Sequence, residues 1–95
     1  MTDPTAISAS EVKNVQQIEA RLVASLAEVL ELPPERIERL KPFTDFGLDS
    51  IKAFSLTGDL AEWIDQDLPA TLFWDYPNVE ALARYVAEQL GVVPT

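Results

Sequence analysis

The sequence predicts an all-α fold: a small bundle of three main helices and one short helix, with a long loop between the first two. Apolar residues recur at three- and four-residue steps in three separate stretches, the spacing of one face of an amphipathic helix. A helix-starting residue precedes each stretch, and proline, glycine or a polar turn follows it. The length of 95 residues leaves room for one domain. We expect that domain over residues 8–91, with residues 1–7 as a disordered lead-in or a linker and residues 92–95 as a tail or linker.

The first helix is predicted from residue 8 to the proline pair Pro33 and Pro34. Ser8 and Glu11 have the spacing of a capping box, in which each side chain accepts a free backbone N–H group at the helix start. The prolines lack the N–H group that would continue the helix. The expected core face consists of Val15, Ile18, Leu22, Leu26 and Val29.

A long connection, residues 32–49, leads to the second helix. A loop of this length in a compact domain is usually functional or anchored by its own apolar side chains. Residues 35–38 are expected to form a brief helical turn. The expected anchors are Ile37, Leu40, Phe43 and Phe46.

The second helix is predicted from Ser50 to about Asp65, with Asp49 as its N-cap residue. Its expected core stripe is Ala53, Leu56, Leu60 and Ile64. This phase leaves the outer face to Ile51, Phe54, Ser55, Gly58, Asp59 and Glu62. A different helical phase would bury Ile51 and Phe54 instead, and the pattern leaves both phases open.

Two residues of this helix stand out. Gly58 lies in the helix interior, where glycine costs roughly 1 kcal/mol relative to alanine. Close approach of another backbone, or of a bound partner, would explain it, and the sequence does not decide between them. Trp63 is expected to be a large core or rim side chain.

Two further helices follow a polar turn. A short third helix is predicted from Thr71, as its cap, to Tyr76, and Pro77 closes it. Asn78 is the expected N-cap of the last helix, and Gly91 suits its C-terminal cap. The expected core stripe of the last helix is Val79, Leu82, Val86 and Leu90.

The composition excludes several classes of function. Without cysteine there is neither a disulfide nor a thiolate metal site, and without histidine the commonest metal ligand and general base is missing. The acidic residues 59, 62, 65 and 67 lack the spacing of a calcium loop, so we expect no metal site. The sequence shows no membrane-spanning run and no signal pattern, so we expect a cytoplasmic chain that does not bind membranes.

The net charge of −9 disfavours binding to nucleic acid, because phosphate groups would be repelled. The charge is unevenly distributed. Residues 1–44 carry seven acids and five bases, whereas residues 45–95 carry nine acids and two bases. The negative field therefore belongs to the half that contains Ser50, and it favours partners with basic docking faces.

Ser50 is the predicted functional residue. Gly47 permits a tight turn before Ser50. The Ser50 hydroxyl is expected at the open N-terminal end of a helix, where free amide groups favour a phosphate. Asp49 opposes that charge slightly. The chain offers no histidine and no G-x-S-x-G elbow, so Ser50 is predicted to be an acceptor and not a catalyst.

Two blocks of sequence resemble a known family. Residues 47–51 read G-L-D-S-I and resemble the G-x-D-S signature of acyl carrier proteins. Residues 68–83 contain L-P-x-T and D-Y-P and are similar to the matching stretch of carrier domains from modular polyketide synthases. With the preceding helix, the resemblance covers roughly residues 11 to 90.

The resemblance implies a non-catalytic acyl carrier with the four-helix fold of that family. Ser50 would carry a 4′-phosphopantetheine arm, attached from coenzyme A by a phosphopantetheinyl transferase with Mg²⁺, and the arm would hold acyl groups as thioesters. Other implied partners are a ketosynthase, an acyltransferase or a fatty-acyl-AMP ligase, and the domain itself would be monomeric. The predicted docking residues are Leu48, Asp49, Ile51, Phe54, Asp59 and Glu62.

The expected pathway is polyketide or mixed lipid–polyketide synthesis, and two alternatives remain. Peptidyl carrier domains more often read G-G-H-S or G-G-D-S at the serine, where this chain has F-G-L-D-S. Phe46 and Asn78 replace the usual leucine and threonine of the polyketide pattern, which weakens the assignment to a subfamily. The alternative from another class is an acidic helical interaction module that carries nothing covalent.

Overall fold

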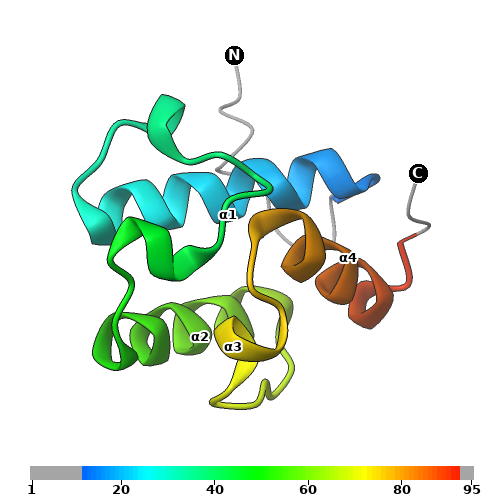
Figure 1. The fold of residues 1–95 in the computed structure, drawn as a ribbon. Coiled ribbons are helices and arrows are strands. Elements are labelled where there is room, and N and C mark those ends of the chain that lie inside the picture. Colours follow the sequence, from blue (N-terminus) through cyan, green and yellow to red (C-terminus); the bar gives the residue numbers. More distant parts are fainter. Residues whose placement is uncertain (1–11, 93–95) are drawn as a thin grey trace.

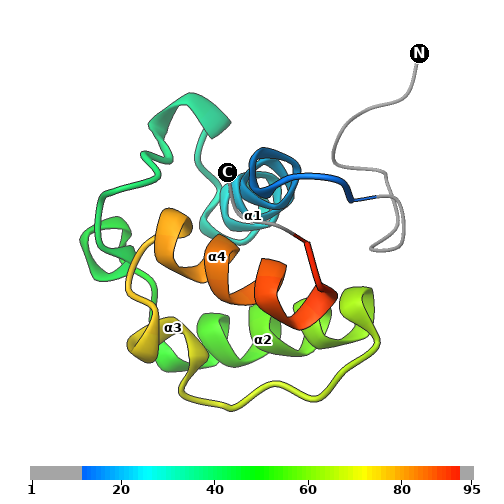
Figure 2. The same cartoon turned by 90° about the vertical axis from the view of Figure 1, so that its right-hand side faces the viewer.

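In the computed structural model, residues 12–92 are described, and they form four α-helices and two 3₁₀ turns (Figure 1). The elements in chain order are α1 (Val15–Leu30), η3 (Pro34–Arg36), η4 (Phe43–Phe46), α2 (Ser50–Ile64), α3 (Leu72–Asp75) and α4 (Val79–Leu90). Helix α1 packs against α4 and α2, and α3 packs against α2 (Figure 2). The predicted all-helical bundle is confirmed.

Each long helix starts at a residue whose side chain accepts a backbone N–H group. The pairs are Asn14 with Gln17 (2.9 Å), Asp49 with Lys52 (2.8 Å) and Asn78 with Ala81 (2.8 Å). The predictions for Asp49 and Asn78 are therefore confirmed. The first helix begins later than predicted, because Asn14 caps it at Val15, and the capping box at Ser8 and Glu11 lies outside the described residues.

The three long helices end where the chain enters the left-handed region of backbone conformation. Gly91 closes α4 with φ of 73°, as predicted. Glu31 closes α1 and Asp65 closes α2, with φ of 56° and 55°. Glycine adopts this conformation without strain, whereas side chains disfavour it. The last residue of α1 is Leu30, so the helix ends before the proline pair, and Glu31 is the residue that closes it.

The predicted core stripes form the interior. Of their members, only Val29 and Leu90 are half-buried, because they lie near helix ends and pack at the edge of the core. The largest fully enclosed side chains come from α1, the long loop, α3 and α4: Phe43, Ile18, Leu26, Leu72, Leu82, Val79 and Val86. Phe43 and Phe73 place their rings 5.0 Å apart and join the loop to α3.

The long connection is anchored, although not by every predicted residue. Ile37 and Phe43 are buried, and Phe46 is half-buried. Leu40 was expected to anchor the loop, but 60% of it is exposed, because it lies in a surface turn that the Lys41 N–H group closes by donating to the Glu38 carbonyl (3.2 Å). The predicted turn at residues 35–38 appears as η3, one residue earlier.

Hydrogen bonds tie this connection to the start of α4. The Phe43 N–H donates to the Pro77 carbonyl (2.8 Å), and the Glu80 N–H donates to the Arg39 carbonyl (3.0 Å). The Arg39 side chain pairs with Glu80 and lies 3.6 Å from the Glu19 carboxylate on α1. The segment that delivers Ser50 is thus held against both α1 and α4.

The short helix α3 differs from its prediction in detail. It ends at Asp75 and not at Tyr76. Thr71 occupies the N-cap position, but its hydroxyl donates to the Asp75 carboxylate (2.9 Å) and not to a backbone group of the first turn. Within residues 12–92, the helices are too short or too polar to cross a membrane.

Candidate modification site and docking surface

Ser50 is the first residue of α2, and its side chain is exposed. A left-handed Gly47, with φ of 82°, closes η4 three residues before Ser50. A β-carbon at position 47 would meet no atom within 4 Å beyond its chain neighbours, so the glycine is required by the backbone conformation and not by space. The turn at Gly47 reverses the chain and places Ser50 at the exposed end of the helix.

Leu48 does not have the role predicted for it. It was expected on the docking surface, but only 7% of it is exposed and it belongs to the core. Its apolar side chain turns inward, between the exposed residues Gly47 and Asp49. Leu48 therefore anchors the loop that precedes Ser50, and it is too buried to belong to a docking surface.

The surroundings of Ser50 suit a covalently attached phosphodiester. Among residues 12–92, no side chain or backbone group forms a hydrogen bond with the Ser50 hydroxyl. The Asp49 carboxylate accepts the Lys52 N–H group, which leaves the amides of Ser50 and Ile51 in the open first turn. Free amides and the helix dipole favour a phosphate at this position. The residues present therefore fit the predicted arm.

Two large apolar side chains lie exposed on α2, close to Ser50. Ile51 is 82% exposed and Phe54 is 69% exposed. This result settles the open question of helical phase, because the predicted core stripe of α2 is buried on the opposite side. We use the name α2 patch for the five exposed residues Ile51, Phe54, Gly58, Asp59 and Glu62.

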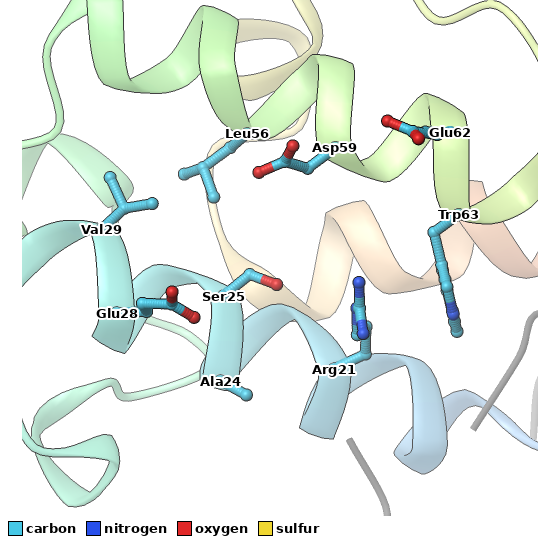
Figure 3. A pocket seen from close by; sticks show the side chains of 9 residues that line it. All are labelled: Arg21, Ala24, Ser25, Glu28, Val29, Leu56, Asp59, Glu62 and Trp63. Carbon is cyan, nitrogen blue, oxygen red and sulfur yellow. The ribbon is translucent and has the colours of Figure 1, made fainter. Parts of the chain in front are cut away.

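A groove of about 430 Å³ separates α1 from α2 beside this patch (Figure 3). It is lined by Arg21, Ala24, Ser25, Glu28, Val29, Leu56, Asp59, Glu62 and Trp63. Asp59 and Glu62 thus belong to the patch and to the rim of the groove. The Arg21 guanidinium lies 5.3 Å from the centroid of a Trp63 ring, and Figure 3 shows both side chains between the two helices.

Sequence reasoning did not find this groove. Its two walls come from helices whose separation in space no local pattern encodes. Trp63 was predicted to be a core or rim side chain, and its half-buried position at the rim was the available signal of the groove. On α2, the first residue that lines the groove is Leu56, six positions after Ser50. The groove and the serine are therefore separate features of this helix.

The sequence model of one protein family, described as the phosphopantetheine attachment site, matches residues 20–86. The chain is 27% identical over 87 residues to a component of the phenolphthiocerol/phthiocerol polyketide synthase of Mycobacterium tuberculosis, covering 92% of this chain and 4% of that protein. It is 39% identical over 69 residues to polyketide synthase ThaG of Burkholderia thailandensis, covering 73% of this chain and 1% of that protein. The chain thus spans only a few per cent of these relatives.

Solved structures of carrier proteins superpose well on this chain. A free-standing peptidyl carrier protein from an uncharacterized secondary metabolic pathway of Acinetobacter baumannii superposes with a TM-score of 0.80 and 38% identity, covering 83% of this chain and 99% of the other. The HMG-ACPI domain of the CurA module from Lyngbya majuscula superposes with a TM-score of 0.77 and 30% identity, covering 95% of this chain and 87% of the other.

The extent of the family match and the shared fold identify the chain. The predicted carrier function and its covalent cofactor are confirmed at the level of the family. The chain belongs to the phosphopantetheine attachment site family, whose members are non-catalytic carrier domains that hold 4′-phosphopantetheine covalently, and it is homologous to the carrier domains of polyketide synthases.

Proposed function

We propose that Ser50 receives the 4′-phosphopantetheine arm and that the chain carries acyl intermediates in polyketide or mixed lipid–polyketide synthesis. The observation that carries this proposal is the exposed Ser50 hydroxyl at the start of α2, free of hydrogen bonds to residues 12–92. When bound, the arm supplies a terminal thiol that holds acyl groups as thioesters.

Three other hydroxyl groups, on α2 and at the start of α3, fit less well. The Thr57 hydroxyl is buried and donates to the Ala53 carbonyl (2.8 Å), and the Thr71 hydroxyl donates to Asp75. Ser55 is exposed on α2, but it lies inside the helix, where the amides are used by intrahelical bonds. Ser50 combines an accessible oxygen with open amides that stabilise a phosphodiester.

The chain itself does not activate the serine. It contains no histidine, and the Lys52 side chain, two helical positions from Ser50, faces a different direction. The transfer forms a bond between the Ser50 oxygen and phosphorus and releases adenosine 3′,5′-bisphosphate from coenzyme A. A separate phosphopantetheinyl transferase must therefore supply the base that takes the hydroxyl proton.

The direct test is incubation of the full chain with a broad-specificity transferase, coenzyme A and Mg²⁺. Intact-mass spectrometry should show the gain of one arm, and peptide mapping should place that arm on Ser50. An acidic interaction module would gain no mass. Attachment at another residue would contradict the assignment of Ser50.

A peptidyl carrier is the second candidate, favoured by the 38% identity to the peptidyl carrier protein of known structure. The cargo distinguishes the two. Protein purified from its own host should carry a load whose mass corresponds to an acyl or polyketide chain. A load with the mass of an aminoacyl or peptidyl group would instead favour nonribosomal peptide synthesis.

The α2 patch is our proposed docking surface for the transferase and for the synthase enzymes, which include a ketosynthase and an acyltransferase or fatty-acyl-AMP ligase. Ile51 and Phe54 offer apolar contact area, and Asp49, Asp59 and Glu62 offer negative charge next to it. In such surfaces apolar contact supplies area, whereas charge guides approach and sets register.

We expect the rate of transferase association to fall as salt is added, because exposed charges are screened over about 8 Å at physiological ionic strength. Asp59→Lys and Glu62→Lys should lower the rate further, as measured by stopped-flow fluorescence. Glu88→Lys on α4 is the matched control, because it changes the net charge equally at an exposed site outside the patch. Equal effects of all three changes would remove the local docking surface.

A further inference from the structure

Gly58 has no explanation within the described part of the chain. A helix interior disfavours glycine relative to alanine, yet Gly58 lies in the middle of α2. Apart from its chain neighbours and the nearby backbone of α2 itself, a β-carbon added there would meet no atom within 4 Å, and the backbone of Gly58 lacks the positive φ seen at Gly47. Neither packing nor backbone conformation therefore requires a glycine at this position.

Gly58 lies on the exposed outer face of α2, on the same side as Ile51 and Phe54. At about 100° per residue, Ile51 lies within about 20° of Gly58 around the axis and Phe54 within about 40°. Ile51 and Phe54 therefore lie between Ser50 and Gly58 along the outer face of α2. Asp59 and Glu62 follow Gly58 toward the C-terminal end of the helix. The missing β-carbon leaves a notch in the patch, through which a second backbone can approach α2 closely.

We propose that Gly58 is the close-approach point for the phosphopantetheinyl transferase. A segment of the transferase crosses α2 at the notch, with apolar side chains toward Phe54 and basic side chains toward Asp59 and Glu62. This inference rests on the proposed function of Ser50. It makes Gly58 a determinant of recognition and gives it no part in the chemistry.

Distance favours the transferase over the other enzymes of a synthase. The transferase alone must bring its reacting groups to the Ser50 oxygen, whereas enzymes that act on the cargo meet the far end of the arm. A standard interface of about 800 Å² per partner corresponds to a disc of about 16 Å radius. Gly58 lies eight residues from Ser50, about 12 Å along the helix axis, and so inside a disc centred on the serine.

The test compares Gly58→Ala and Gly58→Gln with the wild-type chain, using a purified broad-specificity transferase, coenzyme A and intact-mass spectrometry. We expect kcat/KM for loading to fall about threefold for alanine and about tenfold or more for glutamine, the scale of one lost interfacial contact. The urea midpoint of unfolding should rise for both variants, because both side chains favour a helix. Slower loading of a more stable protein cannot come from misfolding.

Ser55→Gln is the matched control. It adds the same side chain on the outer face of α2, closer to Ser50, at a position that already has a β-carbon. Loading of Ser55→Gln should therefore fall less than loading of Gly58→Gln. An equal fall would indicate general crowding and would overturn the proposed notch.

The remaining outcomes separate this inference from the proposal on which it rests. Normal loading of Gly58→Gln overturns the notch and leaves Ser50 as the attachment site. Self-association of the wild-type chain that Gly58→Gln abolishes would make a second copy the occupant, and would also overturn the assignment to the transferase. If the wild-type chain accepts no arm, the proposed function and this inference fail together.

Discussion

Ser50→Ala is expected to gain no arm under conditions that load the wild-type chain completely. The reason is chemical, because alanine has no oxygen on which the phosphodiester can form. Intact-mass spectrometry after incubation with a transferase and coenzyme A provides the measurement. Urea denaturation should show a change in unfolding free energy of less than about 1 kcal/mol, because the serine side chain is exposed and free of partners within residues 12–92.

Ser55→Ala is the matched control for this experiment. It removes an exposed hydroxyl from the same outer face of α2, about one and a half turns from Ser50. The variant should load to the same extent as the wild-type chain. Mass gain by Ser50→Ala, or loss of loading in Ser55→Ala alone, would show that the arm is attached elsewhere.

Leu60→Ala is expected to have the largest effect on stability, a loss of about 2–5 kcal/mol of unfolding free energy. Leu60 is 5% exposed and belongs to the inner stripe of α2. Truncation removes buried apolar atoms and leaves a cavity that the bundle fills only in part. Unfolding free energies of about 5–15 kcal/mol are typical of native proteins. This single change should therefore lower the urea midpoint of unfolding strongly.

Ile51→Ala supplies the comparison, because it truncates a branched aliphatic side chain on the outer face of the same helix. Ile51 is 82% exposed, and its removal should change the unfolding free energy by no more than about 0.5 kcal/mol. It should nevertheless weaken docking. A larger stability loss for Ile51→Ala than for Leu60→Ala would mean that the inner and outer faces of α2 are exchanged.

Much of the fold could be predicted from the sequence, because the signals that define these helices are local. Asp49 and Asn78 cap the helices that they were expected to cap, and Gly91 closes the last one. Each signal operates within about one turn of helix, so no distant contact is needed to read it. Recognition of a carrier domain was equally local, since it depended on two short blocks of sequence.

The incorrect details share one cause, which is competition between neighbouring options that only packing resolves. Leu40 and Leu48 are both apolar loop residues, yet the loop exposes the first and buries the second. The Thr71 hydroxyl was expected to cap the backbone but donates to the Asp75 carboxylate. In these cases the residue type was compatible with both outcomes.

The sequence by itself determined that the fold is helical, the caps at Asp49, Asn78 and Gly91, and the serine at the head of α2, because each depends on residues within a few positions of one another. Only the tertiary structure decided which face of α2 is free, which loop residues are anchors and where the groove between α1 and α2 opens. These properties depend on contacts between segments far apart in the chain. Burial of α2 against α1 and α3 selects one helical phase from the two that the sequence pattern leaves open.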